Sequence, residues 1–185
     1  MPKDQPFAAN VSSSEVVFEG MIWNVLSERF AFAEEELTRQ FVEHPGAVAV
    51  LALNAQGQVL MIRQYRHPVR ELLWEIPAGL LDVSGESKAE AAQRELIEET
   101  GYRAESLEPL IDFYTTPGGN SEKISIFLAR ELTFVGRPEI QDGEERELLV
   151  EWIDYADALN SVLASEVKSP SAAVAIMAYA LNQRG

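Results

Sequence analysis

Apolar and polar residues follow two different periods along the chain, and each period predicts a different kind of element. Runs rich in β-branched and aromatic residues, bounded by turn residues, predict strands at 16–18, 21–26, 47–53, 59–63, 110–113, 124–128 and 148–153. Small and apolar residues at helical spacing predict helices at 87–100, 154–164 and 171–181. A tight hairpin turn is predicted at 19–20, and a hairpin connection at 54–57. This order favours an α/β fold in which helices cover a mixed sheet on both sides.

The same pattern divides the chain into three parts. Residues 1–13 mix Pro, Asn, Ser and charged residues without a period, which predicts a flexible tail. Residues 14–42 predict a small β subdomain that is too short to bury a core of its own. It is expected to pack against the main domain or against a second chain, and residues 43–185 are predicted to form that main domain.

Composition narrows the possible functions. The net charge of −15 argues against a surface that binds nucleic acid, because phosphate backbones are bound by clustered Lys and Arg. The chain has no Cys, which excludes thiol chemistry, disulfides and cysteine zinc sites. No segment has the form of a signal peptide or a run of about 18 apolar residues, so we expect no membrane partner and a cytoplasmic location. The two histidines, His44 and His67, lie in no metal-binding motif and are expected to support other residues.

The helix predicted at 87–100 carries the strongest chemical signal. Ser87 and Glu90 have the spacing of a capping box, and Gly101 stands where a left-handed residue ends a helix. The residues predicted to face the core are Ala89, Ala92, Leu96 and Thr100. The other sides of this helix are therefore available for chemistry.

Three glutamates share another side of this helix. Glu95, Glu98 and Glu99 are surface neighbours, and each like-charge contact costs the helix about 0.2–0.5 kcal/mol. Carboxylates without His or Cys suit a hard cation, and Mg²⁺ typically combines one or two carboxylates with waters and substrate phosphates. Arg94 is spaced to pair with Glu90 and Glu98. The alternative interpretation is a solvated acidic helix face.

The stretch that contains this helix resembles the signature of the Nudix hydrolases, Gly-x5-Glu-x7-Arg-Glu-U-x-Glu-Glu-x-Gly-U, in which U is a bulky apolar residue. The matching residues are Gly79, Glu86, Arg94, Glu95, Leu96, Glu98, Glu99, Gly101 and Tyr102. Two positions depart from the signature: six residues rather than five separate Gly79 from Glu86, and Tyr102 replaces an aliphatic residue. The extra residue falls in a predicted loop, where an insertion costs little.

The resemblance implies a fold, a reaction and a cofactor. The fold is a Nudix-type α/β/α sandwich with a mixed sheet, to which this chain adds the small N-terminal β subdomain. The cofactor is Mg²⁺, with Mn²⁺ as the alternative, bound by Glu95, Glu98, Glu99 and the carbonyl of Ala78. Arg94 and Glu99 join the catalytic group. A glutamate of the run 141–147, Glu144 or alternatively Glu145, is implied to act as base or to hold a metal ion.

Two further stretches bear on the substrate. Arg63, Arg66 and Arg70 lie beside an aromatic ring, an arrangement suited to binding a diphosphate and stacking on a base, although solvated arginines at a strand end are the simpler interpretation. Pro117 follows Gly101 by sixteen residues and resembles the marker of the ADP-sugar pyrophosphatases, although Pro-Gly-Gly-Asn is also ordinary turn chemistry.

Membership of that subfamily implies the partners and the contacts of the site. The Pro117 loop would reach the terminal sugar, often in the partner subunit's site, with Glu122 on the ribose and Arg66 on phosphate. Such enzymes are homodimers that exchange N-terminal strands, so a homodimer is expected. The expected substrate is a small nucleoside diphosphate sugar.

The function predicted from these residues is metal-dependent hydrolysis of ADP-ribose, or a related ADP-sugar, to AMP and ribose 5-phosphate. One alternative is a Nudix hydrolase of another nucleoside diphosphate compound, such as ADP-glucose or NADH. A second is a Nudix module that senses ADP-ribose without cleaving it, against which the intact set of Glu95, Glu98 and Glu99 argues. A third is an acidic protein that only binds divalent ions.

Overall fold

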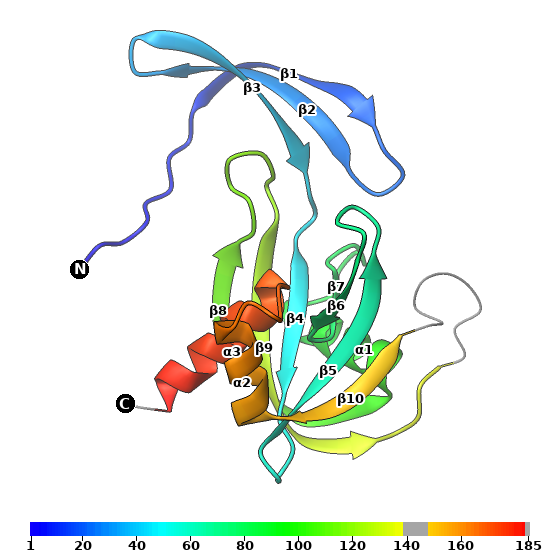
Figure 1. Cartoon of the computed structure of the whole chain (residues 1–185). Coiled ribbons are helices and arrows are strands. Elements are labelled where there is room, and N and C mark those ends of the chain that lie inside the picture. Colours follow the sequence, from blue (N-terminus) through cyan, green and yellow to red (C-terminus); the bar gives the residue numbers. More distant parts are fainter. Residues whose placement is uncertain (139–147, 184–185) are drawn as a thin grey trace. The chain divides into compact units, whose positions relative to one another are not determined.

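The computed structural model describes residues 1–138 and 148–183, which form two compact units (Figure 1). The first unit comprises Met1–His44 together with Tyr114–Glu122, and the second comprises the rest of the described chain. The first unit therefore includes a segment, Tyr114–Glu122, that the sequence places far from the N-terminal strands. No helix in the described part of the chain is both long and apolar enough to cross a membrane.

An antiparallel sheet of three strands builds the first unit. The strands are β1 (Asn10–Glu19), β2 (Asn24–Phe32) and β3 (Glu35–Glu43), in the order β1-β2-β3. A hairpin joins β1 to β2 as predicted, but the tight turn predicted at 19–20 is wrong in position, because Glu19 still pairs with Asn24 and the connection comprises residues 20–23. The tail predicted to reach residue 13 is wrong in extent, because β1 already begins at Asn10. The polar start of β1 is held by hydrogen bonds that apolar periodicity does not reveal. For example, the Ser12 hydroxyl donates across the strands to the carbonyl of Arg29.

Ten elements build the second unit. Its strands are β4 (Ala47–Ala52), β5 (Gln58–Arg66), β6 (Glu71–Glu75), β7 (Ala78–Leu80), β8 (Tyr102–Tyr114), β9 (Lys123–Phe134) and β10 (Leu149–Asp154). Its helices are α1 (Lys88–Thr100), α2 (Tyr155–Leu163) and α3 (Pro170–Asn182). All three predicted helices are present. The short strands β6 and β7 were not predicted, and β8 and β9 extend beyond their predicted ranges.

The strands of this unit form two sheets, with the orders β10-β5-β6 and β7-β4-β9-β8. β4 pairs with β9 in parallel and with β7 antiparallel, so the predicted mixed sheet is present. The hairpin predicted between β4 and β5 is wrong: the turn forms, but only the bridge Leu53↔Val59 joins the strands beyond it. Both strands are almost entirely buried, and each therefore takes a central place in a sheet of its own.

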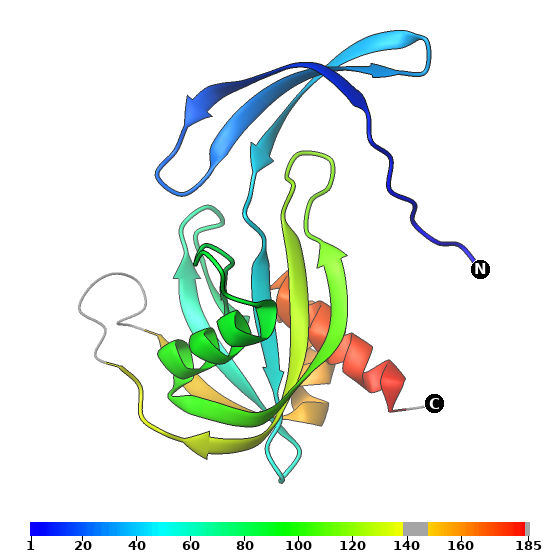
Figure 2. The same cartoon turned by 180° about the vertical axis from the view of Figure 1, so that it is seen from behind.

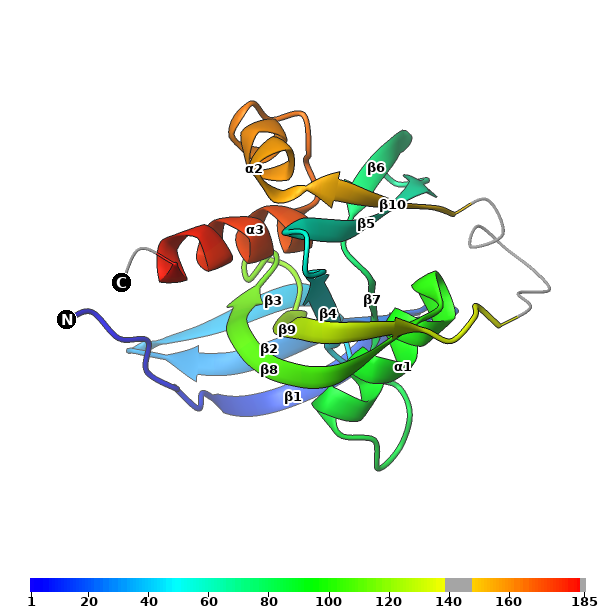
Figure 3. The same cartoon turned by 90° about the horizontal axis from the view of Figure 1, so that it is seen from below.

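β4 separates two clusters of buried side chains. Ala47, Ala49 and Leu51 pack with residues of α2 and α3, whereas Val48, Val50 and Ala52 pack with residues of α1. This alternation follows from the two-residue period of a strand. Figure 2 shows α1 across one face of the sheets, and Figure 3 shows α2 and α3 on the opposite side. The predicted α/β/α arrangement is therefore confirmed.

Candidate functional site

Both ends of α1 are fixed as the sequence predicts. The Ser87 hydroxyl accepts from the amide of Glu90, and the Glu90 carboxylate accepts from the amide of Ser87 at 2.8 Å. The hydrogen bonds from Ser87 lower the pKa of the Glu90 carboxyl. Gly101 ends the helix in the left-handed conformation, with φ of 77°, and its amide donates to the carbonyl of Ile97. The helix that carries the three glutamates is thus held in a defined register.

The buried face of α1 differs from the predicted one. Ala89 is exposed, so its predicted place in the core is wrong. The buried residues are Ala91, Ala92, Leu96, Glu99 and Thr100. Alanine carries a weak apolar signal, and the spacing alone therefore did not fix the rotation of the helix. The rotation that the structure shows turns one of the three glutamates inward.

That glutamate is Glu99, whose side chain is joined to the short strand β7. Glu99 is only 5% exposed, and its Oε2 accepts a hydrogen bond from the Ala78 amide at 2.9 Å. A buried carboxylate needs such a partner, because desolvation of an unpaired charge is costly. Ala78 and Glu99, predicted to act at one metal site, are therefore in direct contact.

Gly79, the next residue of β7, lies against a second glutamate. A Cβ placed on Gly79 would lie between 2.0 and 2.4 Å from the three carboxylate atoms of Glu95. No side chain fits there while Glu95 keeps this position, so the close approach of Glu95, rather than the backbone angles, requires glycine at this residue. The backbone of β7 thus contacts Glu95 and Glu99, one helical turn apart.

Arg94 connects the acidic residues of the site. Its Nε and one terminal nitrogen contact the two oxygens of Glu86, each at 3.0 Å, in a bidentate pair. The other terminal nitrogen contacts Glu95, and Glu98 at 3.2 Å. The hydrogen bonds to Glu86, and secondarily those to Glu95, raise the pKa of the Arg94 guanidinium despite its partial burial. The predicted pairing of Arg94 with Glu98 is confirmed, and that with Glu90 is wrong because Glu90 caps the helix.

The loop before α1 accommodates its additional residue without moving Glu86 out of reach. Gly85 adopts φ of 82°, and the amide of Glu86 donates to the carbonyl of Val83 at 3.2 Å. This turn directs Glu86 toward Arg94, where the bidentate pair forms. The departure from the signature between Gly79 and Glu86 therefore leaves the contact between Glu86 and Arg94 in place.

The donor atoms of this site are all oxygen. Within residues 1–138 and 148–183, no three His, Cys, Asp or Glu side chains converge on a preformed metal position. A magnesium ion needs only one or two carboxylates, since waters and substrate phosphates complete its shell. The side chain of Glu98 is 46% exposed, so its carboxylate is accessible to solvent although it pairs with Arg94. The residues present therefore suit a hard divalent cation that binds together with a phosphate ligand.

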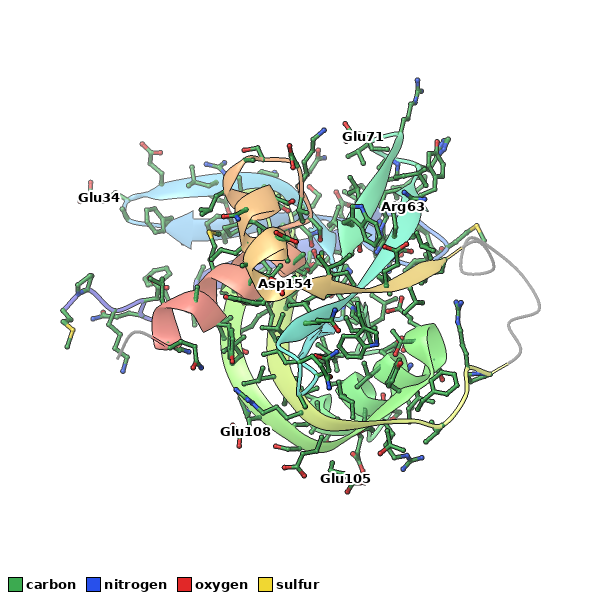
Figure 4. All side chains as sticks on the ribbon, turned by 60° about the horizontal axis from the view of Figure 1, so that its bottom comes forward. Glu34, Arg63, Glu71, Glu105, Glu108 and Asp154 are labelled. Carbon is green, nitrogen blue, oxygen red and sulfur yellow. The ribbon has the colours of Figure 1, made fainter. Side chains whose placement is uncertain are left out.

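The arginines predicted to bind substrate occupy different surroundings. The Arg66 guanidinium forms a bidentate pair with the buried Glu75, at 2.9 and 2.7 Å. Arg63, which is labelled in Figure 4, is on β5. Its guanidinium lies over the ring of Trp74, 5.4 Å from the ring centroid. Positions 63 and 66 are an odd number of residues apart on β5, which directs their side chains to opposite faces of the sheet. Arg70 is exposed in the turn that follows, with φ of 57°.

Comparison with known proteins identifies the domain that carries this site. A model of the NUDIX domain matches residues 43–174. The chain belongs to the Nudix family. It is 39% identical to an ADP-ribose pyrophosphatase of Mycobacterium tuberculosis over 167 residues, 90% of this chain and 80% of the relative. It is 37% identical to an ADP-ribose pyrophosphatase of Bacillus subtilis over 172 residues, 92% of each chain.

A solved structure supports the fold of this Nudix protein. The crystal structure of an ADP compounds hydrolase covers 99% of each chain with a TM-score of 0.74 and 21% sequence identity. At this identity the likeness concerns the fold alone. The fold predicted from the Nudix signature is thereby confirmed along nearly the whole chain.

The remaining predicted site residues do not lie in the described part of the second unit. Pro117 and Glu122 belong to the first unit. Pro117 is exposed in a turn, whereas Glu122 is held by other side chains of that unit. Glu144 and Glu145 lie outside the described residues.

Sequence reasoning missed two residues of the Nudix domain that hold predicted site residues in place. Glu75 binds Arg66 and also accepts from the side-chain amide of Gln64 at 3.3 Å, while Trp74 lies under Arg63. A signal was present, since Glu75 is a single charge inside the apolar run at 72–77. A lone charge in such a run requires a partner, and the nearest arginines in the sequence are Arg70 and, on β5, Arg66 and Arg63.

Proposed function

We propose that this Nudix protein hydrolyses the diphosphate bond of ADP-ribose, or of a related ADP-sugar, with water to give AMP and ribose 5-phosphate. The observation that carries the proposal is the arrangement around α1, where Arg94 joins Glu86, Glu95 and Glu98. The names of the two relatives, which are 37% and 39% identical to most of this chain, support the choice of ADP-ribose.

The metal ligands of this proposal are Glu95, Glu98, Glu99 and the carbonyl of Ala78, with Mg²⁺ as the ion and Mn²⁺ as its substitute. Bound ions of this kind neutralise diphosphate oxygens and lower the pKa of a coordinated water. Glu99 is oriented by the Ala78 amide, and Glu95 is confined by the backbone of Gly79. Arg94 offsets the repulsion between the neighbouring carboxylates by placing a positive charge between them.

The substrate contacts in the proposal are Arg63, Arg66, Arg70, Pro117 and Glu122, and the catalytic base is Glu144 or Glu145. The bidentate pair with Glu75 supports the role of Arg66, because it fixes the plane and direction of the guanidinium. The other assignments are supported by the resemblance of the sequence to ADP-sugar pyrophosphatases.

A homodimer belongs to the same proposal. All ten residues of β1 are exposed, and they include Val11, Val16, Val17 and Phe18. A three-stranded sheet needs an apolar face that is covered to be stable in water. A second copy of the chain would supply that cover.

The test follows AMP release from ADP-ribose with and without Mg²⁺ or Mn²⁺. Metal-dependent release is expected from the wild-type protein, and Glu98→Gln and Glu99→Gln should each lower kcat by about a hundred-fold or more, the scale of losing a group that stabilises transition-state charge. Glu108→Gln, on the exposed side of β8, is the matched control and should be unchanged (Figure 4). Binding of ADP-ribose without release of AMP would refute hydrolysis and favour a sensor.

A further inference from the structure

The loop predicted to meet the terminal sugar is attached to strand β3. The amide of Val42 donates to the carbonyl of Gly119 at 2.9 Å, and the amide of Ser121 donates to the carbonyl of Val42 at 3.0 Å. The amide of His44 donates to the Ser121 hydroxyl at 2.9 Å. These contacts explain why Tyr114–Glu122 belongs to the first unit, although β8 and β9 on either side of it belong to the second.

Within this loop, both oxygens of the Glu122 carboxylate are engaged. The Thr115 hydroxyl donates to Oε2 at 2.6 Å, a short hydrogen bond of the kind that charged acceptors form. Nε2 of His44 lies 3.4 Å from Oε1. The main chain of Glu122 is fixed as well, since its amide donates to the side-chain oxygen of Asn120 at 2.8 Å. These contacts fix the conformation of both the loop and the Glu122 carboxylate.

His44 is itself held firmly. Its side chain is 4% exposed, and its ring lies 5.5 Å from the ring of Trp23 with an angle of 36° between the planes. A buried imidazole of this kind can orient a neighbouring carboxylate in the way that supporting groups orient the residues of a functional site. The Glu122 side chain keeps 21% of its surface exposed, so the carboxylate is both oriented and accessible.

We propose that Thr115 and His44 are positioning residues that fix the Glu122 carboxylate as an acceptor for adjacent hydroxyl groups of the substrate's terminal sugar. A carboxylate has about four lone-pair positions, and Thr115 and His44 use one on each oxygen. Each oxygen therefore retains a position for one sugar hydroxyl, which matches a vicinal diol. The inference rests on the proposed function, because it assigns a role to Glu122 in binding the same substrate.

The test measures KM and kcat for ADP-ribose in variants of the full chain. Thr115→Val and His44→Ala should each raise KM about ten-fold, the scale of one hydrogen bond to a charged group, while kcat changes less than two-fold. Thr115→Ser, which keeps the hydroxyl, and His44→Gln, which keeps an N–H donor, should restore most of the affinity. Thr38→Val, on the exposed side of β3, is the matched control and should behave as the wild type.

A double-mutant cycle separates positioning from general damage to the fold. In the Glu122→Ala background, Thr115→Val should raise KM no further, because the carboxylate that it orients is gone. Additive effects in this cycle, or an unchanged KM in Thr115→Val and His44→Ala, would overturn the inference. Wild-type protein that releases no AMP would instead refute the proposed function, and the inference with it, so the two failures are distinguishable.

Discussion

Replacing Gly79 by alanine should separate the activity of this protein from its stability. The added methyl group would lie 2.0 Å from the carboxylate carbon of Glu95, and that contact must open by about 1.4 Å to reach the 3.4 Å of ordinary van der Waals contact. The atoms in the way are the far end of a flexible side chain, so Glu95 can rotate aside without moving the backbone. We therefore expect a loss of less than about 1 kcal/mol in the free energy of unfolding, within the range of minor substitutions.

The expected loss of activity is much larger. A rotated Glu95 leaves its contact with Arg94 and its proposed place at the metal, and a misplacement of about 1 Å in a catalytic arrangement can lower the rate about a hundred-fold. The assays are urea unfolding and metal-dependent AMP release from ADP-ribose, performed on the same preparations. A Gly79→Ala protein with wild-type kcat would refute the reasoning, and so would a protein that loses several kcal/mol of stability.

Gly57→Ala is the matched control with the opposite expectation. Gly57 adopts φ of 77° and has no atom within 4 Å of an added Cβ, so the substitution strains the backbone without displacing a neighbour. A left-handed alanine costs about 1–2 kcal/mol of stability. The turn of Gly57 contains no proposed site residue, and activity should therefore remain at the wild-type level. The two glycine variants together test whether close approach and backbone angle have separate consequences.

Three further predictions concern an ion pair, the arginine on β5 and the assembly. The hydrogen bond from Lys123 lowers the pKa of the Asp112 carboxyl from its usual 3.8, so Asp112→Asn should be less stable than the wild type at neutral pH, and urea titrations should show the difference shrinking below pH 3.8. Arg66→Lys should lower the free energy of unfolding in urea by about 1–3 kcal/mol, because the buried Glu75 loses its bidentate partner. The same variant should have a higher KM for ADP-ribose. An unchanged stability and KM would contradict the role given to this pair. Sedimentation should give twice the chain mass of 20.6 kDa at micromolar concentration and a smaller mass for Phe18→Asp, whereas a wild-type monomer would exclude the homodimer.

Local signals predicted the local features of this molecule. The capping box at Ser87, the left-handed Gly101 and the boundaries of α2 and α3 all depend on contacts between residues close in sequence. The Nudix signature depends on spacing along one helix, and the pairing of Arg94 with Glu98 could be read from it. For these features the sequence contained the whole physical argument.

Pairings between distant segments could not be read in the same way. The sequence correctly predicts a turn at 54–57. Whether β4 then pairs with β5 depends on which other strands pair with the two edges of β4, and in the structure these are β7 and β9. The partner of Arg66 is likewise set by the register of β6 against β5. Nothing in the sequence indicated that Tyr114–Glu122 would pack with the N-terminal strands, since that contact joins residues more than 70 positions apart, such as His44 and Ser121.

This last contact determines how segments can be exchanged between members of the family. The backbone bonds between Val42 and the loop, and the pairs that His44 makes with Ser121 and Glu122, cross a boundary that a linear division of the chain would place near residue 44. A chimera that receives residues 1–44 from a relative would combine the relative's strand β3 with this chain's own loop at 114–122. The structural unit that can be exchanged is therefore discontinuous in sequence. Residues 1–44 and 114–122 must be transferred together if each is to keep its native contacts.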